Sequence, residues 1–271
     1  MNHKTTKKKR WRRHVNSDPL VFLYDYDDIR DREIVGLIAS SLAYGNVKQI
    51  SKSVDGVLSF MGASPAHFLE TSTPRAIERT FSSFKHRWTT GWDLASMLKG
   101  AKQVIEKYGS LESCFAYGLE TSHVDTVAAL THFVSELKGA DGSSYNSLLP
   151  SPCRNSACKR LHLFLRWMVR SDRVDPGGWT EVSASKLLVP LDRHMYRFAM
   201  DTGLTERKQP NLHTAREVTE AFREISPEDP VKYDFALTRL GILRIDDRNK
   251  FMRQLGMNKG DRIKGGIAWR A

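Results

Sequence analysis

The sequence is poor in cysteine and contains no long apolar run. Its three cysteines, Cys114, Cys153 and Cys158, are too few and too irregular for a disulfide framework and are typical of reduced thiols in a cytosolic protein. No segment approaches the roughly 18 consecutive apolar residues of a membrane span. Because Cys153, Cys158 and His162 have no evident fourth ligand nearby, we expect neither a metal site nor a cofactor.

Glycine and proline are also scarce, with 18 and 10 residues, which excludes a collagen-like or linker-dominated chain. Hydrophobic residues make up 40% and charged residues 27% of the 271, the balance of a globular protein with a buried core. The length suffices for one large domain or two small ones.

Acidic residues are missing from the start of the chain. Seven of the net +11 charges lie within residues 1–14, so the remaining body carries only +4. A basic arm on a mildly basic body favours a polyanionic partner, nucleic acid before a membrane surface. The alternative interpretation is a solvated, disordered tail without a binding role.

Apolar residues recur at helical spacing along most of the chain, and strands and helices do not alternate. We therefore predict an all-α protein. The first helix is expected to be capped by Asp31 and to end at Gly45. Further helices are predicted at residues 47–62, 64–70, 92–107, 110–118, 123–138, 156–170, 192–202, 213–225 and 229–241.

Two polar segments, 138–156 and 171–190, interrupt this helical pattern with Gly, Ser and Pro. The first indicates a long loop or a boundary between helical lobes. The predicted organisation is a disordered basic arm, an N-terminal helical lobe, a C-terminal helical lobe and a weakly ordered tail, at residues 1–16, 17–145, 146–258 and 259–271.

Lys159 occupies an unusual position for a lysine. Asn155 or Ser156 can cap the helix predicted at 156–170, which puts Lys159 in its first turn. The positive end of the helix dipole and the neighbouring Arg160 both disfavour the ammonium form. A neutral lysine amine is a nucleophile that can form a Schiff base. The alternative is an exposed lysine that contacts solvent or a phosphate.

Asp192 follows Pro190 directly ahead of a predicted helix, at the place of an N-cap residue. Backbone N–H donors at such a position favour the ionised carboxylate. An ionised carboxylate can stabilise a cationic, sugar-like transition state or take a proton from a nucleophile. Asp192 can also be a helix cap only, and capping does not exclude catalysis.

The order of these residues resembles the helix-hairpin-helix DNA glycosylases, and within them endonuclease III and the archaeal 8-oxoguanine DNA glycosylases. Lys159 before LHLFLRWMV is similar to the family's lysine, and Asp192, with Arg193 and His194 behind it, is similar to the family's aspartate. EIVGLIASSLAYGNVKQI resembles the early helix and the loop after it, FKHRW a basic-aromatic string of the archaeal branch, and KYDFALTRLGI the last core helix. From about Asp18 to Leu243 the chain also resembles a bacterial family without an assigned function, through SACKRLHLFLRWMVR, VDPGGW and PLDRH.

The glycosylase resemblance implies a two-lobed helical fold with a cleft between the lobes. It implies base-excision repair by a monomeric, cytoplasmic, nucleoid-associated bacterial protein that acts on double-stranded DNA with a damaged base, an oxidised purine by analogy with the archaeal branch. Lys159 and Asp192 are then the catalytic residues. The DNA-binding residues are Tyr44, Gly45, Asn46, Arg87, Ser156, Arg160, Lys186, Arg193 and His194. Phe84, Trp88, Phe164 and Trp167 are candidates for a stacking wall or for the core.

The sequence departs from the glycosylase pattern in three places. LLPSPCRNSACK lacks the glycine pair of the family's hairpin. Lys159 and Asp192 lie 33 residues apart, which is wider than the family spacing, so we expect residues 171–190 to be an insertion that loops out. Lys186 is then a rival nucleophile. No cysteine follows Cys158, so we expect no iron–sulfur cluster. Two alternatives stay open, a non-catalytic helical nucleic-acid-binding protein and a glycosylase that uses water in place of lysine.

Overall fold

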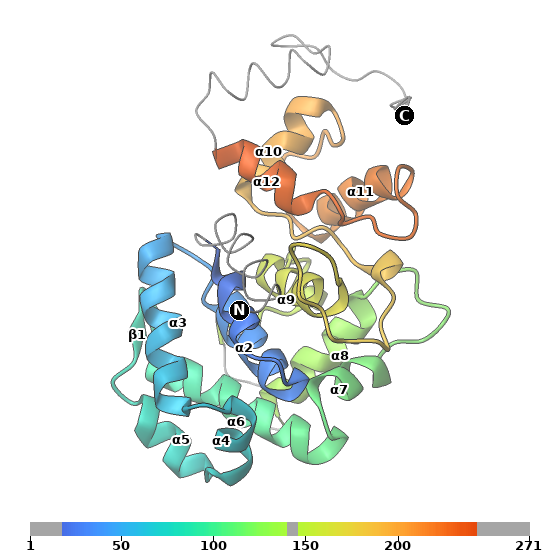
Figure 1. Cartoon of the computed structure of the whole chain (residues 1–271). Coiled ribbons are helices and arrows are strands. Elements are labelled where there is room, and N and C mark those ends of the chain that lie inside the picture. Colours follow the sequence, from blue (N-terminus) through green and yellow to red (C-terminus); the bar gives the residue numbers. More distant parts are fainter. Residues whose placement is uncertain (1–17, 140–145, 243–271) are drawn as a thin grey trace, which may run out of the picture.

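The structure is a computed structural model that describes residues 18–139 and 146–242. Helices form nearly all of the regular structure in these residues, and one two-stranded antiparallel hairpin accompanies them (Figure 1). The 3-10 helices are η1 (Pro19–Asp25), η2 (Pro152–Arg154) and η3 (Ala184–Lys186). The α-helices are α2 (Ile29–Ser41), α3 (Val47–Met61), α4 (Pro65–Thr71), α5 (Pro74–Phe81), α6 (Gly91–Tyr108), α7 (Leu111–Tyr117), α8 (Val127–Lys138), α9 (Lys159–Val169), α10 (Arg193–Thr202), α11 (Leu212–Arg223) and α12 (Asp234–Ile242). The hairpin strands are β1 (Lys85–His86) and β2 (Thr89–Thr90).

The predicted helices are present, although α8 and α12 begin later than predicted. The expected cap at Asp31 is wrong, because Asp28 precedes α2 and accepts a hydrogen bond from the N–H of Arg30. Asp31 instead lies in the first turn, where its carboxylate accepts from the Ser64 hydroxyl and the Ala66 N–H at the start of α4. Asp31 thus joins two helices that the sequence pattern treats separately.

The predicted helix end at Gly45 is also wrong, because α2 stops four residues earlier and Gly45 lies in the loop before α3. The basic arm at 1–16 and the tail at 259–271 lie outside the described residues, as does the end of the proposed C-terminal lobe. The two-lobed division therefore stays a prediction.

The hairpin at residues 85–90 is a feature that the sequence analysis does not predict. Lys85 pairs with Thr90 and His86 with Thr89, which leaves Arg87 and Trp88 as the two turn residues. Arg87 has a φ of 55°, a left-handed conformation that two-residue hairpins ordinarily fill with Gly or Asn. The usual sequence signal for a hairpin is therefore absent.

The centre of the molecule is the packing of α2 against α9. Gly36 makes this close approach possible, since a methyl group in its place would lie 3.1 Å from the Met168 sulfur and 3.3 Å from the Phe164 ring. Phe164 and Trp167 are fully buried here, so their role is in the core rather than in a stacking wall. In Figure 1, α9 lies between the group α10, α11 and α12 at one end and the earlier helices at the other.

A buried network of charges joins α9 to the chain that follows it. The Arg166 guanidinium donates to Asp175 and to Asp234 at the start of α12, and all three side chains are almost completely buried. One turn later, Arg170 pairs with Asp175 and, at 2.9 Å, with Asp229. Because each buried charge faces an opposite one, the network fixes the position of α12 on α9.

The segment after α9, predicted to loop out, folds back along that helix instead. The Gly177 N–H donates to the carbonyl of Trp167 at 3.0 Å, and the Trp179 N–H donates to that of Met168 at 2.9 Å. Gly178 requires its glycine, since its φ is 134° and a methyl group there would lie 2.0 Å from the Ile29 side chain on α2. The part of the insertion up to Trp179 is therefore a structural element.

Removing one partner of this network should destabilise the protein strongly. We expect Arg166→Met to lower the free energy of unfolding by about 3–5 kcal/mol, because Asp234 and Asp175 would lose a buried counter-charge. The control is Arg197→Met, since Arg197 forms an exposed pair with Asp201 at 3.8 Å and should change stability by less than about 1 kcal/mol. Urea unfolding followed by circular dichroism measures both. Equal losses in the two variants would contradict this account of the network.

Candidate nucleic-acid interface

The turn before α9 sets the position of Lys159. Neither Asn155 nor Ser156 caps this helix, which corrects the prediction. Cys158 precedes α9 in a left-handed conformation, with φ 42°, and its side chain accepts no capping hydrogen bond from the first turn. Asn155 is also left-handed, with φ 57°. Two non-glycine residues thus adopt strained backbone conformations at this one turn, a feature that often accompanies functional sites.

Lys159 is half-buried at the first position of α9. Within the described part of the chain its ammonium forms no hydrogen bond and no ion pair. This contrasts with Lys186, the rival nucleophile, whose ammonium donates to the carbonyls of Glu120 at 3.0 Å and Thr121 at 3.1 Å. Of these two lysines, Lys159 is the one whose amine is not already committed to holding another segment.

Asp192 is the N-cap of α10, as predicted. Its carboxylate accepts hydrogen bonds from the backbone N–H groups of His194 and Met195, both at 2.8 Å. Asp192 is half-buried.

Asp234 links these two residues, and the sequence analysis does not identify it as a site residue. Burial raises the pKa of the Asp234 carboxyl, and its partner Arg166 opposes that effect. Asp192 also raises this pKa, and Lys159 lowers it. Lys159 and Asp192 therefore both lie within electrostatic range of the same buried acid. The sequence around Asp234 resembles a core helix, so it gives no indication that Asp234 interacts with Lys159 and Asp192.

The loop after α2 and the hairpin form a second cluster, which contains several predicted DNA-binding residues. The Tyr44 hydroxyl donates to the carbonyl of His86 at 2.9 Å and lies 2.6 Å from the Thr89 hydroxyl. The Tyr44 ring stacks on Trp88, with ring centres 4.9 Å apart and an interplanar angle of 25°. Trp88 is nevertheless 62% exposed and is therefore available to a ligand. We call Tyr44, Arg87 and Trp88 the aromatic patch.

His86 holds the aromatic patch in place from its buried side. It is fully buried, with its Nδ1 2.8 Å from the Ser53 hydroxyl and its Nε2 3.1 Å from the Tyr44 carbonyl. An Nε2–H that donates to the carbonyl leaves Nδ1 to accept from Ser53. Burial, assisted by the positive charges of Arg87 and Arg160, lowers the pKa of His86. A neutral histidine thus fixes the hairpin against α3.

Gly45 and Arg87 lie in contact at the edge of this patch. A methyl group on Gly45, whose φ is 100°, would lie 2.9 Å from the Arg87 side chain. The Arg87 guanidinium lies over the Trp88 ring at 4.7 Å, so it adds positive charge to an exposed aromatic surface. Asn46 caps α3 by accepting from the Lys48 N–H at 3.0 Å.

Arg160 connects this patch with the start of α9. Its guanidinium lies over the Tyr44 ring at 5.0 Å and donates to the carbonyls of Ser41, at 2.6 Å, and Ser147. These contacts give Arg160 a structural role in joining α2, the aromatic patch and the helix that begins with Lys159. Arg160 is also a predicted DNA-binding residue, and it would have to contact DNA without giving up these structural contacts.

The remaining predicted contacts are dispersed. Ser156 accepts a hydrogen bond from the Cys158 N–H at 3.2 Å and pairs as a single β-bridge with Asn211. Arg193 is exposed and His194 half-buried at the start of α10. Phe84, the remaining stacking candidate, is half-buried against the core. The structure therefore brings Tyr44, Gly45, Arg87 and Arg160 together. Lys159 and Asp192 both influence the pKa of Asp234, but no hydrogen bond or ion pair joins the two in the described residues.

The comparisons with known proteins agree with one of the two resemblances. The chain belongs to a family of proteins of unknown function, DUF2400, whose model matches residues 18–243. No curated protein and no solved structure matched the chain. None of the helices in the described residues is long and apolar enough to cross a membrane.

His162, considered above as a metal ligand, lies on α9 with its side chain in the core of the protein. It is buried, and neither ring nitrogen has a hydrogen-bond partner in the described structure. Of the two cysteines considered with it, Cys153 is exposed and Cys158 is buried. Within the described residues no group of three such side chains is placed to hold a metal ion. Burial lowers the pKa of His162 to about 4.

This buried neutral histidine should make the protein sensitive to acid. Between the unfolded pKa of about 6.5 and the folded value of about 4, the unfolded chain binds a proton that the folded chain does not. Stability should therefore fall as the pH decreases through this window, by an amount on the order of 3 kcal/mol. We expect His162→Leu to flatten the dependence of unfolding free energy on pH, measured by urea titrations at pH 7, 6, 5 and 4. Parallel pH profiles for the two proteins would show that His162 is not the titrating group.

Proposed function

We propose that this protein is a DNA glycosylase with AP-lyase activity that removes a damaged base from double-stranded DNA. The observation that supports this most is that an uncommitted lysine, Lys159, and a capping aspartate, Asp192, both act on the pKa of one buried acid, Asp234. The remote resemblance to helix-hairpin-helix glycosylases supplies the reaction class. An oxidised purine is the proposed lesion, and the proposed fold has two helical lobes with the DNA bound across a cleft between them.

In the proposed reaction, the Lys159 amine attacks the sugar carbon that carries the damaged base. A nitrogen–carbon bond forms as the glycosidic bond breaks, and the base leaves with its electron pair and takes up a proton. The sugar ring opens to give a Schiff base, and loss of the 3′ phosphate by elimination nicks the strand. Asp192 takes the proton from the attacking amine and stabilises the positive charge that develops on the sugar.

The aromatic patch gives this reaction a binding surface. Enzymes that act on a base must extrude it from the stack, and the opened duplex then needs a group to fill the gap. Tyr44 and the exposed Trp88 offer stacked rings for the unpaired base, while Arg87 adds a positive charge. Asn46, Arg193 and His194 are proposed to contact the backbone or the opposite base.

A non-catalytic nucleic-acid-binding protein is the second candidate. The observation in its favour is the exposed, positively charged aromatic patch, which would serve binding without any chemistry. The two candidates differ in their chemistry, because only the proposed enzyme releases a base and forms a covalent intermediate.

Borohydride trapping tests the proposed chemistry. Incubating the protein with duplexes that carry an oxidised purine or an abasic site, then reducing, should give a covalent protein–DNA adduct. We expect Lys159→Ala to abolish this adduct and Asp192→Asn to reduce its rate by at least about tenfold, since Asn keeps the helix cap but cannot take a proton. Lys186→Ala is the matched control and should trap normally.

The outcomes separate the candidates. Salt-dependent binding without base release or adduct would leave only the non-catalytic binder. Base release that depends on Asp192 but gives no adduct would identify a glycosylase that uses water. An adduct that persists in Lys159→Ala but disappears in Lys186→Ala would reverse the assignment of the nucleophile.

The aromatic patch should contribute to DNA affinity without contributing to stability. We expect Trp88→Ala to weaken binding to a duplex with an abasic site by about tenfold, because one stacking contact with a base is typically worth about 1–3 kcal/mol. The unfolding temperature should change little, since the ring is largely exposed. Tyr117→Ala, at another exposed aromatic residue, is the control in a fluorescence-anisotropy titration. Unchanged affinity in the Trp88 variant would remove the patch from the interface.

A further inference from the structure

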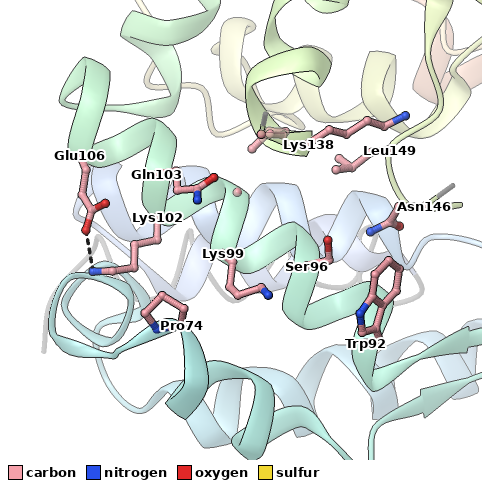
Figure 2. A pocket seen from close by; sticks show the side chains of 13 residues that line it. Pro74, Trp92, Ser96, Lys99, Lys102, Gln103, Glu106, Lys138, Asn146 and Leu149 are labelled. Atoms are coloured by element: carbon pink, nitrogen blue, oxygen red, sulfur yellow. Dashed lines mark ion pairs between the residues drawn. The ribbon is translucent and has the colours of Figure 1, made fainter. Parts of the chain in front are cut away.

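Lysines on α6 have acidic partners. In the pocket shown in Figure 2, Lys102 pairs with Glu106 at 3.0 Å, and Lys99, which also lines this pocket, pairs with Glu78 on α5. Each of these pairs neutralises the positive charge of its lysine locally, so this surface offers little excess charge to an anion. Cations without such partners are a stronger indication of a surface that binds anions.

The cations beside the aromatic patch have no such partners. Lys52 on α3 and Lys85 on β1 are exposed, and neither ammonium forms a hydrogen bond or an ion pair within the described residues. The same holds for Lys48, which lies one turn before Lys52. The Arg87 guanidinium also has no ion pair there and lies over the Trp88 ring. The positive charges of these two neighbouring segments are therefore unbalanced in the described structure.

A buried contact holds together the two segments that carry these charges. The His86 ring on β1 lies 2.8 Å from the Ser53 hydroxyl on α3, and Figure 1 shows β1 beside α3. Lys52 directly precedes Ser53, and Lys85 directly precedes His86. Because successive side chains of a strand point to opposite faces, Lys85 points outward where His86 points into the protein. The two lysines thus lie on the exposed side of one contact between α3 and the hairpin.

Negative charge is absent from both segments. Residues 42–54 and 82–92 contain no aspartate and no glutamate. Asp55, which follows the first segment, forms no ion pair with a lysine of α3 in the described structure. Asp93, which follows the second, is held in the capping box of α6. The surface formed by the two segments therefore favours an anionic ligand.

Trp88 indicates which kind of anion fits this surface. Its indole is 62% exposed, although it stacks on Tyr44. Surfaces that bind unpaired nucleotides combine exposed aromatic rings, on which bases stack, with cations that follow the backbone. An isolated phosphate would use the cations but not the ring. A nucleic-acid strand uses both.

We propose that Lys48, Lys52 and Lys85 bind the phosphates of the nucleic-acid strand whose unpaired base stacks on Trp88. We call these three residues the lysine track. The aromatic patch contacts the base, and the lysine track contacts the backbone next to it. Lys48 and Lys52 lie about 6 Å apart along the axis of α3, so the strand follows that helix. This proposal rests on the nucleic-acid binding that both candidates of the proposed function share, and it does not need the lyase chemistry.

Fluorescence anisotropy at several salt concentrations tests the lysine track in the full-length protein. The probes are a fully paired DNA duplex and the same duplex with one abasic site. Each phosphate contact contributes about 0.9 to the slope of log K against log salt concentration. We therefore expect Lys52→Gln together with Lys85→Gln to reduce this slope by about two and to weaken the binding of both duplexes at least about tenfold at about 0.1 M salt.

Trp88→Ala should behave differently from the lysine variant. It should weaken the binding of the abasic duplex only, because the paired duplex offers no unpaired base. It should leave the salt slope unchanged, because stacking on a base neutralises no phosphate and releases no counterions. The two variants thus separate the contact with the base from the contacts with the backbone.

Arg75→Gln together with Arg79→Gln is the matched control. These arginines are exposed four residues apart on α5, and neither forms an ion pair in the described part of the chain. Neither belongs to the aromatic patch or to the lysine track. Removing the same amount of charge there should leave the salt slope and both affinities unchanged. Thermal unfolding should show that all variants are folded.

The outcomes separate this proposal from the proposed function. Equal losses in the two double variants would show a general effect of net charge and overturn the lysine track. A wild-type salt slope in the variant of Lys52 and Lys85 would overturn it as well, even where Trp88→Ala still weakens binding. A reduced slope without base release or adduct would support the lysine track and reject the glycosylase. Absence of salt-dependent binding by the wild-type protein would reject both.

Discussion

The buried pairing of Arg166 with Asp175 and Asp234 is the interaction on which the rest of the structure depends. Arg166 lies on α9, which packs on α2 through Gly36, and Asp234 begins α12. The network therefore connects the central helix pair to the last described helix, and Arg170 extends it to Asp229. A charge buried in this way is costly when its partner is missing, so removing any one member of the network destabilises the others. It ties the C-terminal helices to one position on the core.

That constraint also places the candidate site. Lys159 begins the helix that carries Arg166 seven residues later, and Asp192 caps the helix that packs against α12. Both act on the pKa of Asp234, which is held by Arg166. The strained turn at Cys158 and the absence of a capping side chain indicate a helix start not optimised for stability. The DUF2400 family has no assigned function, so membership in it does not identify an activity. The glycosylase proposal depends on this arrangement and on the remote resemblance.

Helical spacing predicted most of the fold because apolar periodicity reports which face of each helix is buried. α3, which is strongly amphipathic, has the predicted bounds almost to the residue, and Asp192 was correctly assigned as a cap because Pro190 stops the chain before it. Helix starts were harder, since Asp28 and Asp31 are both good caps and only the contact with α4 decides between them. The hairpin could not be predicted, because its turn uses Arg87 in a conformation typical of glycine. Asp234 was missed for another reason. Its role depends on Arg166, 68 residues away, and no local pattern reports such a pairing.

The central claim is that Lys159 and Asp192 share one charged environment, and a double-mutant cycle tests it most directly. Unfolding free energies would be measured at low salt for Lys159→Met, Asp192→Asn and the double variant, with the Asn side chain preserving the helix cap. The account predicts that the two effects are not additive, with a coupling energy above about 0.5 kcal/mol that shrinks as salt is added. Effects that add to within about 0.3 kcal/mol at every salt concentration would contradict it, because groups that do not sense each other cannot form one catalytic site.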